Sequence, residues 1–222
     1  MLEELYLKAR EEDADMVICD YISEYKSGGV VCRQAPRECT SESILQQMLF
    51  QQLHGSCCNK LIRRACYKEY NVAFPKDIIR WEDLYVVCSL LMHPIKCVYL
   101  PKAFYHYDLV INENSIVRKV TFKGLDSQIK FIEHFRKIGC TIDLLYPSMR
   151  ATKELAYCSE FLETKQIISL FLEINEKYIN EPKGLLDFVP KGLTALIKGK
   201  HVISSFYKIL YSLWLLKKKY IW

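Results

Sequence analysis

The spacing of apolar residues in the first half of the chain alternates between helical and extended patterns. Recurrence every three to four residues predicts amphipathic helices, and short apolar runs bounded by turn residues predict buried strands. This alternation indicates an α/β arrangement. In chain order, the predicted elements are a helix at 2–12, a strand at 15–21, a turn at 27–29, a returning strand at 30–32, a capped helix from Thr40 to about His54, a small helix at 65–70, an acidic helix from Trp81 to His93, and extended segments at 95–100 and 104–107.

The second half of the chain has helical periodicity only. Helices are predicted at about 122–138, 148–159 and 163–178, and the change of pattern places a boundary near Lys119. We therefore expect an α/β part at 1–118, a helical extension at 119–183, and basic amphipathic C-terminal helices at 184–222.

Composition narrows the class of protein. With 222 residues, half of them hydrophobic, the chain can bury a sizeable core. The net charge of +5 is mild, and the two signs are interspersed along most of the chain, which argues against a nucleic-acid binder. Ten cysteines without regular spacing indicate reduced thiols, and the adjacent pair Cys57-Cys58 lacks the gap of a zinc site. No uninterrupted apolar run approaches the roughly 20 residues that span a bilayer.

Glu82 and Asp83 are the strongest candidates for chemistry. These adjacent carboxylates lie at a predicted helix start, where exposed N–H groups and the helix dipole stabilise the ionised forms. A charged carboxylate can act as a general base and deprotonate a hydroxyl group. Acidic residues are also common in the first turn of any helix, so simple capping is the alternative interpretation.

The motifs around this pair favour the catalytic interpretation. In order, they are Asn-Lys-Leu-Ile-Arg-Arg at 59–64, Phe-Pro at 74–75, Trp-Glu-Asp-Leu at 81–84, Tyr-Leu-Pro at 99–101, Tyr-His-Tyr at 105–107 and Asn-Glu-Asn-Ser-Ile at 112–116. This series resembles the rear, acceptor-side part of bacterial family 2 glycosyltransferases with the GT-A fold, which build capsule, exopolysaccharide and lipopolysaccharide chains. The resemblance covers about 1–118. It implies a partial GT-A-like, Rossmann-related mixed sheet flanked by helices.

The resemblance also implies roles for the acidic motif. Asp83 is expected to deprotonate the acceptor hydroxyl as it attacks the anomeric carbon of a nucleotide-activated sugar, with Glu82 as its supporting neighbour. The attack is a single in-line displacement, so the anomeric configuration is expected to invert. Trp81 is either an apolar wall for the sugar ring or a core aromatic residue.

Other residues of the motifs are candidates for substrate binding. The Asn-Lys and Arg-Arg pairs of 59–64 offer donors to acceptor hydroxyls or diphosphate, and a solvated surface face is the alternative. His106 faces away from both neighbouring tyrosines, so it either points toward a metal or diphosphate or is a structural residue. Arg118 is a candidate diphosphate clamp. The substrate-binding candidates are Trp81, Asn59, Lys60, Arg63, His106, Tyr107 and Arg118.

The family's front half, with its βαβ unit and metal-holding Asp-x-Asp motif, has no counterpart in this sequence. Asp13-Ala14-Asp15 has the letters of that motif, but no βαβ unit precedes it, so we interpret the match as accidental. We expect a truncated chain that is inactive alone and binds no metal. The complete enzyme would use Mn²⁺ or Mg²⁺ to transfer a sugar from a nucleotide-sugar donor to a glycan or lipid-linked acceptor. The alternative is a non-catalytic accessory or interaction protein derived from this scaffold.

The C-terminal segment 184–222 combines apolar and aromatic residues with lysines. Basic amphipathic helices of this kind bind anionic membrane interfaces, and Trp214, Tyr220 and Trp222 suit the interfacial belt. Packing on the catalytic domain, or on a second copy in a homodimer, is the alternative. The expected location is cytoplasmic, peripheral on the inner face of the cell membrane.

Overall fold

The computed structural model describes residues 1–108, 121–158, 162–174 and 195. The chain divides into two compact units, one comprising 1–119 with 126–143 and the other 120–125 with 144–222. Most of the helix that begins at Phe122 therefore packs with the first unit. The domain boundary near Lys119 stays a prediction.

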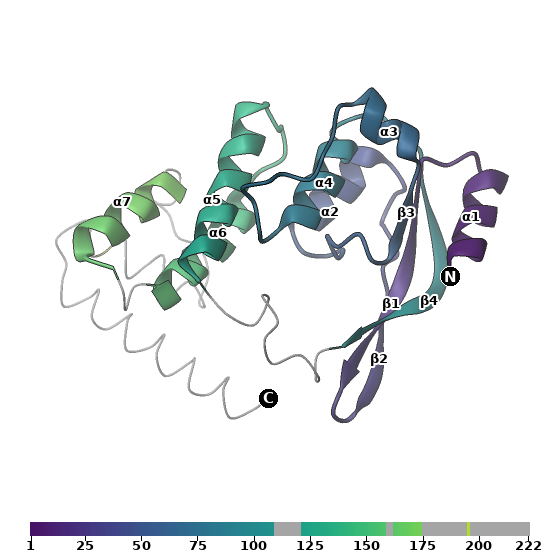
Figure 1. The fold of residues 1–222 in the computed structure, drawn as a ribbon, viewed down its shortest axis with the longest axis horizontal. Coiled ribbons are helices and arrows are strands. Elements are labelled where there is room, and N and C mark those ends of the chain that lie inside the picture. The colour runs from purple at the N-terminus through teal and green to yellow at the C-terminus, as the bar shows by residue number, and fades with distance from the viewer. Residues whose placement is uncertain (109–120, 159–161, 175–194, 196–222) are drawn as a thin grey trace. The chain divides into compact units, whose positions relative to one another are not determined.

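The first unit is built on a four-stranded mixed sheet (Figure 1). Its strands are β1 (Met16–Tyr25), β2 (Gly28–Cys32), β3 (Lys60–Ile62) and β4 (Cys97–Asp108). β1 is central: β2 and β3 pair antiparallel with successive parts of β1, and β4 pairs with it in parallel. The predicted α/β class with a mixed sheet is confirmed.

β4 is one continuous strand where the sequence predicted two extended segments. Its register with β1 moves from Cys19 opposite Leu100 to Asp20 opposite Ala103, so Pro101 and the residue after it are skipped. Proline has no N–H to donate to a sheet, and a local bulge lets the pairing continue beyond it. The strand therefore carries the Tyr-His-Tyr motif along β1.

Helices cover both faces of this sheet. Figure 1 shows α1 (Leu2–Glu11) on one side and α2 (Ser41–Leu49) and α4 (Glu82–Leu91) on the other. Leu5 of α1 is fully buried in a core cluster with strand residues that include Val17 and Cys19. The two remaining helices of this unit are α3 (Arg64–Glu69) and α5 (Phe122–Lys137).

α2 begins as the sequence predicted and ends earlier. The Thr40 hydroxyl oxygen accepts a 3.2 Å hydrogen bond from the Ser43 N–H, which is the expected N-cap. The helix ends at Leu49, and Gln51 follows with a φ of 57° in the left-handed region. This reversal turns the chain back toward β3, and we call residues 54–59 of this connection the 54–59 loop.

The second unit contains α6 (Leu145–Cys158) and α7 (Thr164–Ile174), close to two of the predicted helices. The two helices contact each other. The predicted basic segment 184–222 lies outside the described residues except for residue 195, as does the predicted end of the last helix at 178. Within the described part of the chain, no helix has both the length and the apolarity needed to cross a bilayer.

Candidate functional site

The acidic pair begins α4, as the sequence predicted. Trp81 is the N-cap, with a φ of 70° and ψ of 15°, and its carbonyl accepts a 2.7 Å hydrogen bond from the Tyr85 N–H. The left-handed conformation costs a non-glycine residue about 1–2 kcal/mol. It directs the chain so that Glu82 and Asp83 are the first two helical residues, where the helix dipole stabilises negative charge.

Asp83 is held through one of its two carboxylate oxygens. Its Oδ2 accepts hydrogen bonds from the Ser56 hydroxyl at 2.9 Å and from the Cys57 N–H at 3.0 Å. Both donors belong to the 54–59 loop. The other oxygen, Oδ1, has no hydrogen-bond partner among the residues that the structure describes, and the side chain is half-buried. One oxygen is thus oriented by the protein, and the other can accept a proton.

Groups around Asp83 respond to its charge. Burial raises the pKa of Glu82, and the neighbouring Asp83 carboxylate adds to the effect. Burial likewise raises the pKa of Tyr67 to about 12, with smaller contributions from Cys57 and then Asp83. The pKa of Tyr107 is also raised, mainly by burial, and Asp83 is among the charges that contribute. These side chains therefore lie within electrostatic range of Asp83.

Asn59 and Lys60 lie inside the protein and not on a solvated face. Asn59 has no exposed surface, and its Nδ2 donates to the Cys19 carbonyl at 2.7 Å. The Lys60 ammonium donates to the carbonyls of His54 at 2.7 Å and Ser56 at 2.6 Å and to the Asn59 Oδ1 at 2.8 Å. Burial lowers the pKa of Lys60 to about 8. Because the protein uses these donors, the geometry favours a positioning role, and contact with substrate stays a prediction.

Tyr107 and His106 lie in different surroundings, as the alternation along β4 predicts. The Tyr107 ring packs against Tyr21 and His54, with ring centroids 6.4 and 5.9 Å apart. The Tyr21 and His54 rings are themselves 4.9 Å apart. His106 is largely exposed, and its Nδ1 lies 2.6 Å from a carboxylate oxygen of Glu24. Within the described residues, no contact directs His106 to the acidic pair, and its role toward a metal or diphosphate stays a prediction.

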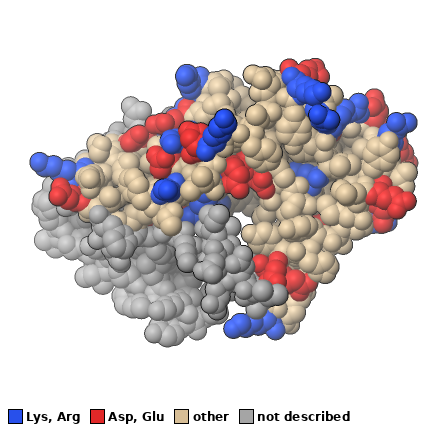
Figure 2. Space-filling view, in the orientation of Figure 1, with Lys and Arg blue, Asp and Glu red and all other residues tan. Residues whose placement is uncertain are grey.

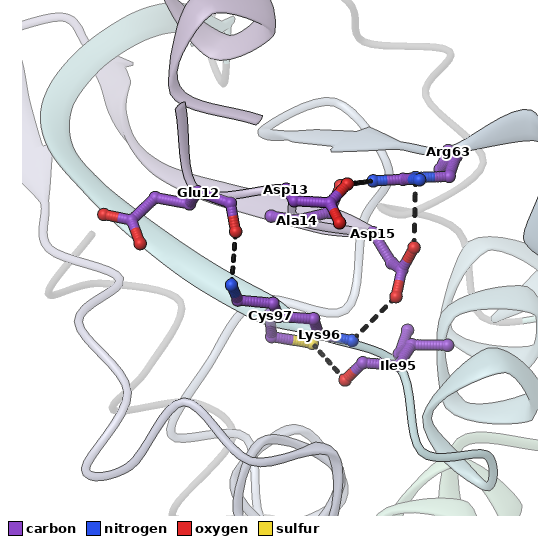
Figure 3. Close-up of polar contacts among 8 residues, drawn as sticks. All are labelled: Glu12, Asp13, Ala14, Asp15, Arg63, Ile95, Lys96 and Cys97. Carbon is purple, nitrogen blue, oxygen red and sulfur yellow. Dashed lines mark hydrogen bonds and ion pairs between the residues drawn. The ribbon is translucent and has the colours of Figure 1, made fainter. Parts of the chain in front are cut away.

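Arg63 is directed to the Asp-x-Asp sequence at the start of β1 and not to the acidic pair (Figure 3). Its guanidinium contacts the Asp13 carboxylate at 2.7 Å and the Asp15 carboxylate at 3.0 Å. Asp15 also accepts a 2.9 Å hydrogen bond from the Lys96 N–H, while the Lys96 ammonium bonds to the Glu12 carbonyl. The two aspartates thus tie together the starts of β1 and β4 and the end of β3. Binding of substrate by Arg63 stays a prediction.

The Trp81 ring packs on α5. It meets the fully buried Phe131 edge-to-face at a centroid distance of 5.3 Å. Next along α4, the Tyr85 hydroxyl lies 3.1 Å from the His134 Nε2. These contacts match the core interpretation of Trp81, and a wall for a sugar ring stays a prediction. Arg118 lies outside the described residues.

Two residues of the site had no sequence prediction. Ser56 belongs to no recognisable motif, so nothing in the sequence indicated that it contacts Asp83. Asp20 is buried, and its carboxylate accepts hydrogen bonds from the Gln34 N–H at 2.6 Å and the Tyr99 hydroxyl at 2.8 Å. The Gln34 Oε1 in turn accepts from the His54 N–H at 2.7 Å. An acidic residue inside an otherwise apolar predicted strand was the available signal for Asp20.

The charges on the visible face are mixed. Figure 2 shows Lys and Arg interspersed with Asp and Glu over the described residues of that face. Among the described residues, no group of three or more His, Cys, Asp or Glu side chains is arranged to hold a metal ion. The groups that donate to Asp83 are a hydroxyl and a backbone amide, which suit a carboxylate and not a cation.

Comparison with known proteins identifies the fold. No protein-family model matches the chain, and no curated protein matches it in sequence. Among solved structures, a crystal structure of residues 1–349 of the S. aureus glycosyltransferase TarS has a TM-score of 0.55 at 12% identity and covers 96% of this chain. The fold is glycosyltransferase-like.

A second TarS structure agrees with the first. It is a complex with UDP-GlcNAc, with a TM-score of 0.54, 12% identity and 96% coverage of this chain. At this identity the likeness shows the fold alone. The chain spans 62% and 63% of the two TarS chains.

Proposed function

We propose that this chain supplies the acceptor-side catalytic part of an inverting glycosyltransferase of family 2 with the GT-A fold. The observation that carries the proposal is the arrangement of Asp83: it lies at a helix N-terminus, two donors hold its Oδ2, and its Oδ1 is left to accept a proton. The left-handed Trp81 before it supports the proposal, because backbone strain of this kind clusters at functional sites.

The proposed step is a single displacement. The Oδ1 of Asp83 takes the proton of an acceptor hydroxyl while the hydroxyl oxygen forms a bond to the anomeric carbon of the donor. The bond from that carbon to the diphosphate oxygen breaks, and its electron pair leaves with the nucleoside diphosphate. Attack from the face opposite the leaving group inverts the anomeric configuration.

A nucleotide sugar is the proposed donor, and a glycan or lipid-linked acceptor of a cell-envelope polysaccharide pathway is the proposed acceptor. Support for the donor class comes from the glycosyltransferase-like fold and from the neighbour bound to UDP-GlcNAc. We propose that donor and metal (Mn²⁺ or Mg²⁺) are held by a donor-binding part outside this chain. The chain's own residues then orient the acceptor and accept its proton.

The test replaces the proposed base. In the enzyme completed by its donor-binding part, Asp83→Asn should lower transfer from UDP-GlcNAc by about 10²–10⁴-fold, because general-base catalysis typically contributes that much. Asp77→Asn is the matched control, since Asp77 is an exposed partner of Lys130 on the surface. The measurement is release of UDP in the presence of acceptor. Full turnover by Asp83→Asn would eliminate Asp83 as the base.

A non-catalytic accessory or interaction protein derived from this scaffold is the second candidate, favoured by Asn59 and Lys60, whose donors bond within the protein. Both candidates predict that calorimetric titration of this chain alone with UDP-GlcNAc and Mn²⁺ gives no heat of binding. Detectable binding would place a donor site inside the chain and contradict the proposed division. The two candidates differ in the Asp83→Asn assay, where an accessory protein loses no transfer activity.

Peripheral membrane contact through 184–222 is a separate proposal that rests on the basic amphipathic composition of that segment. Flotation with liposomes that contain anionic lipid tests it. The full chain should float, and a chain that ends at residue 183 should stay in the soluble fraction. Equal soluble fractions would refute membrane contact by this segment.

A further inference from the structure

We infer that Lys60 is a positioning residue for Asp83, acting through the 54–59 loop, so that Oδ1 is the oxygen that accepts the acceptor's proton. The inference rests on the proposed role of Asp83 as the base. It is carried by a continuous set of hydrogen bonds that begins on the sheet and ends on that carboxylate.

The end of the 54–59 loop is anchored on the central strand. The Asn59 carbonyl accepts from the Cys19 N–H at 3.0 Å, and the Asn59 side chain donates back to the Cys19 carbonyl at 2.7 Å. The next residue, Lys60, begins β3 opposite Ile18 of β1. The root of the Lys60 side chain is therefore fixed by the sheet.

From that root, the Lys60 ammonium reaches back over the loop. It donates to the His54 carbonyl, the Ser56 carbonyl and the Asn59 Oδ1, all within 2.6–2.8 Å. These oxygens all carry partial negative charge and would repel one another without a cation between them. An ammonium group has three donors, and each has a partner here, so neither a neutral amide nor an apolar side chain can replace it.

Ser56 connects the lysine to the base. Its carbonyl accepts from Lys60, while its hydroxyl and the following Cys57 N–H both donate to the Asp83 Oδ2. The loop is also packed closely on α4, because a Cβ atom at Gly55 would lie 2.5 Å from the Leu84 Cδ1. The loop and the start of α4 thus fix each other. Occupation of Oδ2 from one side leaves Oδ1 as the basic atom.

The Cys57 N–H is the reporter for a test, because its acceptor is the Asp83 carboxylate. Hydrogen exchange of this amide is measured by NMR on the full chain and on Lys60→Met, with Lys68→Met, an exposed lysine of α3, as the control. We expect Lys60→Met to lower the protection factor of the Cys57 amide at least tenfold and Lys68→Met to leave it unchanged. The Cys19 amide, bonded to the Asn59 carbonyl, shows whether the sheet is still folded.

A pH titration of the unmodified chain tests the inference even if Lys60→Met does not fold. The titratable groups around the ammonium are Cys57, Cys58, Asp83 and Cys19. Their negative charges raise the pKa of Lys60, but burial has the larger effect and lowers that pKa to about 8. Opening of the 54–59 loop exposes the lysine and restores its ordinary pKa, so loss of its proton above about pH 8 favours the closed loop. In the unmodified chain, the protection factor of the Cys57 amide, corrected for intrinsic exchange, should therefore rise with pH above about 8. The onset of the rise should match the titration of the Lys60 Nζ followed by its nitrogen chemical shift.

A second variant separates the contact between Lys60 and Ser56 from the contact between Ser56 and Asp83. Ser56→Ala removes the hydroxyl donor while keeping the carbonyl that Lys60 binds, and Ser56→Thr restores a hydroxyl. In the completed enzyme, Ser56→Ala should lower kcat about tenfold with little change in the KM for the donor, and Ser56→Thr should recover most of it. Unchanged Cys57 protection in folded Lys60→Met, or no pH response in the unmodified chain, overturns the inference.

Failure of the proposed function would look different. If Asp83→Asn retains full transfer, Asp83 is not the base, whatever the exchange measurements show. If Asp83→Asn loses transfer activity while the protection of the Cys57 amide does not depend on Lys60, Asp83 is still the base but Lys60 does not position it.

Discussion

Replacing Lys60 with Met keeps an unbranched side chain one atom shorter and removes its charge, so this variant measures what the buried ammonium does to stability. Burial lowers the pKa of Lys60 from its ordinary value of 10.5 to about 8 in the folded chain. In the unfolded chain the lysine is solvated, and its pKa returns to the ordinary value.

The magnitude and its sign follow from linkage. A pKa that drops from 10.5 to about 8 corresponds to about 3 kcal/mol, since each pH unit is worth about 1.4 kcal/mol. Between these two values the unfolded chain binds more protons than the folded chain, so the contribution of Lys60 to the free energy of unfolding rises with pH. Below about pH 8 both states hold the proton and the contribution stays at its lowest. By pH 9.5 the gain should be about 2 kcal/mol.

Urea unfolding at a series of pH values from 7 to 9.5, in a reducing buffer, measures this effect. The free energy of unfolding of the unmodified chain minus that of Lys60→Met should increase by about 2 kcal/mol over the series. A buried thiol such as Cys97 works in the opposite direction, because burial raises its pKa to about 12, but it is present in both proteins and its effect cancels in the difference. Lys68→Met, at an exposed position, should give no trend. A difference that does not change with pH would refute the lowered pKa of Lys60 in the folded chain.

Three further changes test the packing around the site by urea unfolding. Gly55→Ala should destabilise the chain by about 1–3 kcal/mol, because the new Cβ would lie 2.5 Å from the Leu84 Cδ1; unaltered stability would contradict that close approach. Phe131→Ala removes a fully buried ring that supports Trp81 and should cost about 3–5 kcal/mol, whereas a loss below 1 kcal/mol would mean that α5 is not packed there. Arg63→Met breaks exposed ion pairs with the two aspartates before β1 and should cost less than about 1 kcal/mol. A loss of several kcal/mol would show that these pairs are more than surface contacts.

Local patterns predicted the elements that depend on neighbouring residues. The Thr40 cap, the apolar run of β1 and the acidic start of α4 are properties of a few adjacent residues, and the structure has each of them. The opposite directions of His106 and Tyr107 likewise follow from strand geometry. The motif series also led to the glycosyltransferase-like fold, while membership of family 2 stays a proposal.

The tertiary structure decided which polar groups meet. Whether the Asn-Lys pair faces solvent, substrate or the core depends on the return of the 54–59 loop to β1, some 40 residues earlier in the chain. The same holds for Ser56, which contacts a carboxylate 27 residues away. Short-range periodicity carries no information about such contacts, because they form only when separate elements pack.

The amino-acid sequence was enough to predict the order of helices and strands, the α/β class and the acidic pair at a helix start, because these follow from apolar spacing and capping chemistry. Packing between distant segments set three further features: Asp83 is held through one oxygen, the buried Lys60 bonds to the 54–59 loop, and the Asp-x-Asp residues bind Arg63. This is because desolvation and hydrogen bonding of a charged group depend on what packs around it, and these neighbours come from distant parts of the chain.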